Sequence, residues 1–96
     1  MEADQVFARN IRVAREHERI SQSELAARLK EVGMDVPQQT VARIEGGTRK
    51  VSVGEAFALS RALQTGLDDL VDPTFVPRPD LHEAVRLLKA YEAGEL

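Results

Sequence analysis

Residues 21–50 have the sequence SQSELAARLKEVGMDVPQQTVARIEGGTRK, and this stretch decides the fold. It predicts two short helices with a turn between them. The first helix begins after Ser21, and Glu24 three residues later completes a capping box, in which the two side chains satisfy free backbone N–H groups at the helix start. Leu25 and Leu29 follow at helical spacing and are expected to face the core.

The second helix is expected to begin around Pro37, because proline has no N–H to leave unbonded at a helix start. Val41 and Ile44 are spaced to point inward, and Gly46-Gly47 end the helix, since glycine adopts a left-handed conformation at low cost. The outer face then carries Gln38, Gln39, Ala42 and Arg43. A glutamine amide matches N6 and N7 of adenine, and an arginine guanidinium matches O6 and N7 of guanine. Such a face is typical of a helix that reads bases in the major groove, and we call it the reading helix.

This stretch resembles the helix-turn-helix of the Cro and lambda-repressor-like family, also called the XRE family. The matching residues are Ser21-Gln22-x-Glu24-Leu25-Ala26 and Gln38-Gln39-Thr40-Val41-x-x-Ile44-Glu45-x-Gly47, and the resemblance extends to about residue 71. It implies an all-α fold, a five-helix lambda-repressor-like helix-turn-helix bundle. A C-terminal amphipathic helix is added to that bundle here.

The resemblance also implies roles for single residues. Gln38, Gln39 and Arg43 would read bases, and an internal ion pair between Arg15 and Glu45 would orient the first helix against the reading helix. Contacts to the DNA backbone would come from Gln22, Thr40, Thr48, Arg49 and Lys50. Thr40 could instead touch a thymine methyl group. Taken alone, the two glutamines could be solvated residues at a helix start, but the full pattern over residues 21–47 favours base reading.

Further helices are expected on both sides of the motif. Asp4 is expected to cap a first helix that runs to about His17, with an inward stripe of Phe7, Ile11 and Ala14. Ser52 and Glu55 predict a second capping box. The helix that follows is the most apolar, and its expected core residues are Val53, Ala56, Phe57, Leu59, Ala62 and Leu63. A short fifth helix is expected around Leu67, Leu70 and Val71.

Three prolines, Pro73, Pro77 and Pro79, predict an extended linker. The expected organisation is a DNA-binding domain over residues 1–72, a linker over residues 73–80 and a C-terminal helix over residues 81–96. That helix carries an apolar stripe formed by Leu81, Val85, Leu88 and Tyr91. We expect the stripe to dimerise with a second chain. The alternative is that it docks on its own bundle while the dimer forms at the short fifth helix.

Composition excludes several classes of function. The 96 residues include no cysteine, which removes disulfides, thiolate metal sites and cysteine nucleophiles and fits the cytoplasm. No apolar run approaches the ~20 residues of a membrane helix, and the acidic, polar N-terminus is no secretory signal. His17 and His82 stand in no metal-ligand spacing. We therefore expect a cytoplasmic protein without metal, cofactor or enzymatic activity.

The net charge of −3 is unevenly distributed. Residues 1–50 hold nine basic and eight acidic side chains, and residues 51–96 hold four and eight, so the acid lies away from the reading helix. We expect a homodimeric transcriptional regulator that binds duplex DNA at an operator with an inverted repeat, as a phage- or plasmid-type repressor or an autoregulating antitoxin. The acidic charge motivates one alternative, a protein-interaction module of the same fold that binds a protein partner and no DNA.

Overall fold

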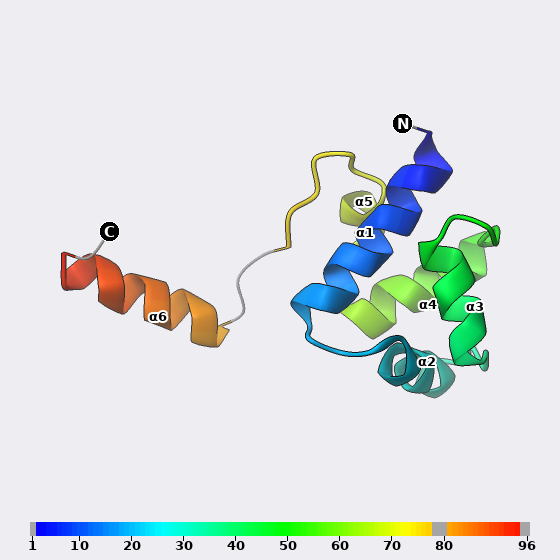
Figure 1. Ribbon diagram of the computed structural model, residues 1–96, viewed down its shortest axis with the longest axis horizontal. Coiled ribbons are helices and arrows are strands. Elements are labelled where there is room, and N and C mark those ends of the chain that lie inside the picture. Colours follow the sequence, from blue (N-terminus) through cyan, green and yellow to red (C-terminus); the bar gives the residue numbers. More distant parts are fainter. Residues whose placement is uncertain (1, 78–80, 95–96) are drawn as a thin grey trace.

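The computed structural model describes the backbone of residues 2–77 and 81–94 and the side chains of residues 2–77 and 85–94. These residues form helices and no strand, which confirms the expected all-α class. The helices are α1 (Ala3–His17), α2 (Gln22–Glu31), α3 (Gln38–Glu45), α4 (Val53–Leu63), α5 (Leu67–Leu70) and α6 (Leu81–Glu92). The first five pack into one bundle, whereas α6 lies apart from it (Figure 1). Within the described residues, no helix has the length and apolar character to span a membrane.

Local signals set the helix starts. Ser21 Oγ accepts a hydrogen bond from Glu24 N at 3.0 Å, and Ser52 Oγ accepts one from Glu55 N at 3.1 Å, so both predicted capping boxes are present. The prediction that Asp4 caps α1 is wrong. Glu2 is the N-cap residue, and Asp4 lies inside the first turn, where the helix dipole also favours a negative charge.

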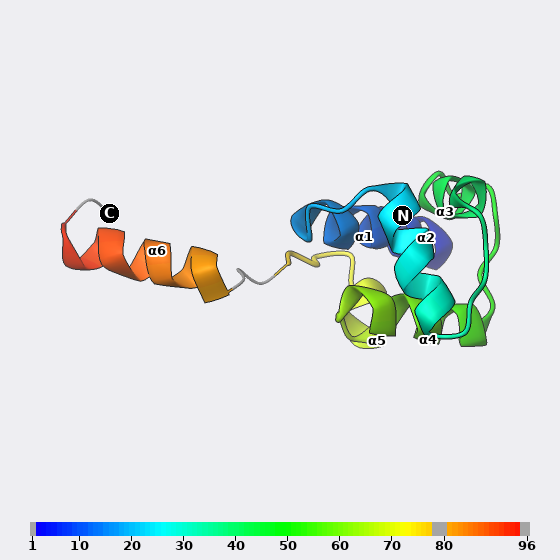
Figure 2. The same ribbon diagram turned by 90° about the horizontal axis from the view of Figure 1, so that it is seen from below.

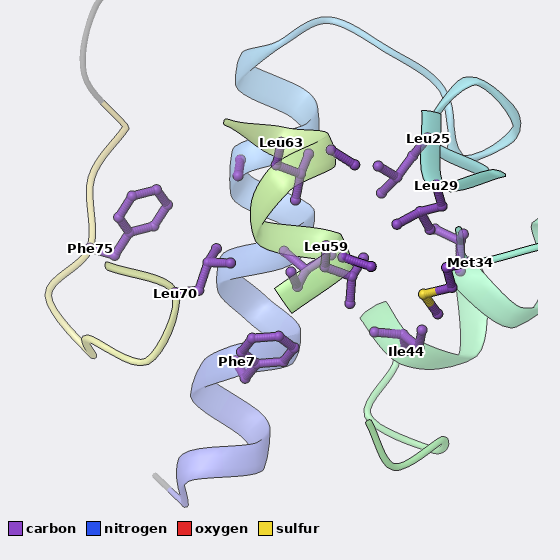
Figure 3. Close-up of a cluster of buried hydrophobic side chains, with 14 residues drawn as sticks. Phe7, Leu25, Leu29, Met34, Ile44, Leu59, Leu63, Leu70 and Phe75 are labelled. Carbon is purple, nitrogen blue, oxygen red and sulfur yellow. The ribbon is translucent and has the colours of Figure 1, made fainter. Parts of the chain in front are cut away.

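The core joins all five helices of the bundle through buried apolar side chains (Figure 3). The inward stripe of α1 packs against Leu25 and Leu29 of α2, Val41 and Ile44 of α3, and Leu59 of α4. The connection from α2 to α3 adds Met34, whose backbone N–H donates to Leu29 O at 2.9 Å. The helix-turn-helix is therefore held as part of one core and not as a separate hairpin.

The prediction that Val53 and Phe57 belong to the core is wrong, because their side chains are 85% and 56% exposed. Successive residues of a helix are turned by about 100°. Ala58, Leu59, Ala62 and Leu63 define the buried face of α4, and Val53 and Phe57 point to the opposite side. Arg61, four residues after Phe57, lies on the same side of α4 and is exposed too, so this side of the helix faces solvent. Val71, at the end of α5, is also exposed.

The packed unit ends later than the expected boundary at residue 72. Phe75 is buried against the core, and its backbone N–H donates to Asp72 O at 3.1 Å in a turn that follows α5 (Figure 3). The first residues of the proline-rich segment therefore belong to the bundle. Residues 78–80 of the predicted linker lie outside the described residues.

Asn10 holds this C-terminal turn against α1. Its side chain is fully buried, and Nδ2 donates to Leu70 O at 3.0 Å, to Asp72 O at 2.8 Å and more weakly to Asp69 O at 3.3 Å. Its Oδ1 accepts from Arg9 Nη1 at 2.9 Å. The carbonyls at the end of a helix have no partner within the helix, so Asn10 supplies the donor that α5 lacks.

Replacing Asn10 by alanine is expected to destabilise the fold by about 2 kcal/mol, because buried carbonyls would lose their donor. Urea unfolding followed by helical circular dichroism measures the change. The control is Arg12→Ala, an exposed position on the same helix, which is expected to shift stability by less than about 0.5 kcal/mol. Equal stability of Asn10→Ala and wild type would show that the turn does not depend on this side chain.

Candidate nucleic-acid interface

The polar face of α3 is presented to solvent. Gln38, Gln39, Ala42 and Arg43 are exposed, while Val41 and Ile44 on the inner side are buried. The helix lies at the edge of the bundle in both views (Figures 1 and 2). A helix held by two buried residues with a polar outer face is free to enter a major groove, which is wide enough to admit it.

A largely buried ion pair fixes α3 against α1. Arg15 Nε donates to Glu45 Oε2 at 2.6 Å and Nη2 donates to Glu45 Oε1 at 3.0 Å. The two side chains are only 13% and 3% exposed. Arg15 Nη1 also donates to Ile20 O at 2.9 Å, so the guanidinium holds the α1–α2 connection as well. The hydrogen bond to Glu45 raises the pKa of Arg15 further above its usual range, although burial opposes it.

Gln22 joins the same carboxylate. Its Nε2 donates to Glu45 Oε1 at 3.2 Å, which links the start of α2 to the end of α3. The amide nitrogen carries two hydrogens, so one donor remains for the phosphate contact expected of Gln22. That contact stays a prediction. The hydrogen bond to Glu45 gave no signal in the sequence, because the two residues lie on different helices.

The loop after α3 carries the other residues expected at the DNA backbone. Gly47 has a positive φ of 75°, and Thr48 N donates to Arg43 O at 3.0 Å, so the chain reverses tightly at the end of the reading helix. Thr48 and Lys50 are exposed, and Thr40 in the first turn of α3 is half-buried. Arg49 differs from its neighbours, because its guanidinium pairs with Glu55 of α4.

The predicted dimerisation stripe lies on α6. Val85, Leu88 and Tyr91 are exposed, and the adjoining Leu87, which the prediction did not include, is exposed too. The side chain of Leu81 lies outside the described residues. In the part of the chain with described side chains, no cluster of His, Asp and Glu has the arrangement of a metal site.

The fold and the exposed face of α3 define a helix-turn-helix domain of the kind that binds DNA. A family model described as helix-turn-helix matches residues 11–70. The chain therefore belongs to the Cro and lambda-repressor-like, or XRE, helix-turn-helix family, as its motif predicts. Comparisons with curated proteins and with solved structures find no match. Membership of this family makes the chain a DNA-binding regulator of transcription.

Glu45→Gln is expected to destabilise the fold by about 3 kcal/mol, because it leaves the largely buried Arg15 cation without its counter-charge. Chemical unfolding of the purified protein measures the loss. Glu16→Gln is a matched control, since Glu16 lies 4.0 Å from the same arginine but is well exposed, and surface pairs contribute less than about 1 kcal/mol. If the two variants lose equal stability, the pair with Glu45 is not what fixes α3.

Proposed function

We propose that this protein is a repressor that binds an operator with an inverted repeat as a homodimer and reads it with Gln38, Gln39 and Arg43. The observation that carries the proposal is the exposed amide and guanidinium face of α3, on a helix fixed from behind by Val41, Ile44 and the Arg15–Glu45 pair. Such rigid support matters, because a bidentate contact to a base edge needs the side chain at a fixed position.

Repression fits a DNA-binding bundle better than activation does. Occupying a promoter is sufficient to exclude another protein from the same DNA, whereas activation needs a further contact to a partner. A prophage or plasmid repressor and an autoregulating antitoxin both meet this description. The protein-interaction module remains the rival function, and duplex binding separates the two.

Gln38→Ala and Gln39→Ala are each expected to cost ~1–3 kcal/mol on the preferred duplex, because an adenine edge would lose its amide partner. The preferred duplex is first selected from a randomised library with the wild-type protein. Fluorescence anisotropy then compares each variant on that duplex and on a scrambled one. Affinity for the scrambled duplex is expected to stay unchanged.

Gln64→Gly serves as the control, because it removes an exposed glutamine at the far end of α4, where the positive φ of 52° suits glycine. If both alanine variants bind the selected duplex like wild type, base reading by these residues is wrong. If the library yields no preferred duplex at low salt, sequence-specific repression is wrong and the rival interaction module is favoured.

We assign dimerisation to α6. A single DNA-binding domain contacts few base pairs, and a two-fold pair of domains reads two half-sites about one helical turn, ~34 Å, apart. Val85, Leu88 and Tyr91 follow at helical spacing and expose apolar surface, which is most readily removed from water by a second copy of the same helix. The competing surface is formed by Val53, Phe57 and Val71, which are exposed on α4 and at the end of α5.

Single cysteines distinguish these surfaces, because the natural chain has none. Leu88→Cys is expected to form a disulfide-linked dimer under mild oxidation, since the two copies of residue 88 would face each other across a two-fold axis. Arg86→Cys, on the opposite side of α6, and Phe57→Cys are expected to remain monomeric on non-reducing gels. A dimer from Phe57→Cys and none from Leu88→Cys would move the interface to α4.

A shortened chain ending at Pro77 completes this test, because it keeps the buried Phe75. We expect light scattering to show a folded monomer, and fluorescence anisotropy to show that this monomer binds the operator more weakly. A shortened chain that stays dimeric and binds normally would contradict the role of α6.

A further inference from the structure

Arg49, in the loop after the reading helix, forms an ion pair with Glu55 of α4. Arg49 Nη1 donates to Glu55 Oε1 at 2.8 Å, and Nη2 donates to Oε2 at 2.8 Å. Nη1 also donates to Lys50 O at 3.0 Å. Two parallel hydrogen bonds of this kind are the arrangement that a guanidinium otherwise makes with a phosphate.

Glu55 is held in place from its own side. Its Oε1 also accepts from Ser52 N at 3.0 Å in the capping box of α4. The hydrogen bonds from Arg49 and then from Ser52 lower the pKa of Glu55 to about 2, so the carboxylate keeps its charge at any physiological pH. The Glu55 carboxylate is therefore already ordered by Ser52 when it accepts the two hydrogen bonds from the Arg49 guanidinium.

We propose that Glu55 withholds Arg49 from DNA phosphates, and that it thereby lowers the affinity for DNA of any sequence and leaves selection to α3. This inference rests on the proposed function, since it concerns how tightly the same interface holds any duplex. Phosphate contacts add affinity without sequence information. Neutralising one cation in the loop therefore reduces the sequence-independent part of binding, whereas the base contacts of Gln38, Gln39 and Arg43 are unaffected.

The charge balance of the loop supports this reading. Arg49 and Lys50 are its two cations, and Glu55 neutralises the first, while Lys50 is exposed. A phosphate that takes Arg49 must break two hydrogen bonds and leave a carboxylate next to the DNA. Arg49 would then replace one anion held by two hydrogen bonds with another, so the net gain in affinity for DNA is small.

Glu55→Gln tests the proposal. Glutamine also completes a capping box, so the start of α4 is kept while the negative charge is removed. We expect affinity for a scrambled duplex to rise several-fold, and the slope of log affinity against log salt to steepen by about 0.9, the value for one added phosphate contact. Because a phosphate contact carries no sequence information, affinity for the selected duplex is expected to rise by a similar factor, so that the ratio of the two affinities stays unchanged.

Two controls make the test specific to Arg49. Arg49→Ala combined with Glu55→Gln is expected to lose the added slope. Glu18→Gln removes a carboxylate from another arginine, Arg28 at 3.0 Å, at the opposite end of α4 from the loop, and is expected to leave the salt slope unchanged. Thermal unfolding of each variant verifies that the bundle is intact.

An unchanged or shallower salt slope in Glu55→Gln overturns the proposal. The proposal also fails if the steeper slope persists in the double variant without Arg49, or if Glu18→Gln produces the same steeper slope. A weaker interaction with all duplexes would show instead that Glu55 positions Arg49 for DNA. These outcomes differ from a failure of the proposed function, in which the wild-type protein itself would prefer no duplex in the same titrations.

Discussion

The carboxylate of Glu45 is the point on which the geometry of the DNA-binding surface depends. It accepts two hydrogen bonds from Arg15 and one from Gln22, so a single side chain at the end of α3 connects α1, α2 and α3. Val41 and Ile44 give α3 its burial, but apolar packing alone allows a helix to slide or rotate by small amounts. Directional hydrogen bonds restrict that freedom, because their strength falls steeply away from the preferred angle. The hydrogen bonds of Glu45, on the side of α3 that faces the bundle, therefore fix the orientation of its exposed face.

The parts of the fold that follow from local chemistry were predictable. Ser21 with Glu24 and Ser52 with Glu55 determine helix starts through neighbours three residues away, and the spacing of Val41 and Ile44 determines which side of α3 is buried. The same spacing left Gln38, Gln39 and Arg43 on the outside, where the structure has them. Their contacts with bases, like the backbone contacts of Thr48 and Lys50, remain predictions.

Features that depend on distant partners were not predictable from local patterns. Asn10 is a polar residue within an apolar stripe, and its partners are carbonyls about sixty residues later in the chain. Val53 and Phe57 are a different case, because the exposed Arg61 lies on the same side of α4 and marks it in the sequence as the side that faces solvent. Glu55 was recognised as a capping residue, yet the capping box also turns its carboxylate toward Arg49, and that second contact depends on the path of the loop.

The burial of Phe75 has a consequence for avidity. Because Phe75 is fixed to the bundle, the chain that connects it to Leu81 spans at most about 20 Å, at roughly 3.5 Å per residue. In the proposed dimer, a DNA-binding domain that leaves its half-site is still tethered by its bound partner, which keeps it within a few tens of ångströms of the DNA. Short tethers of this kind produce effective concentrations in the millimolar range. The released domain would then rebind faster than the whole dimer dissociates, so the residence time on the operator would exceed that of a single DNA-binding domain.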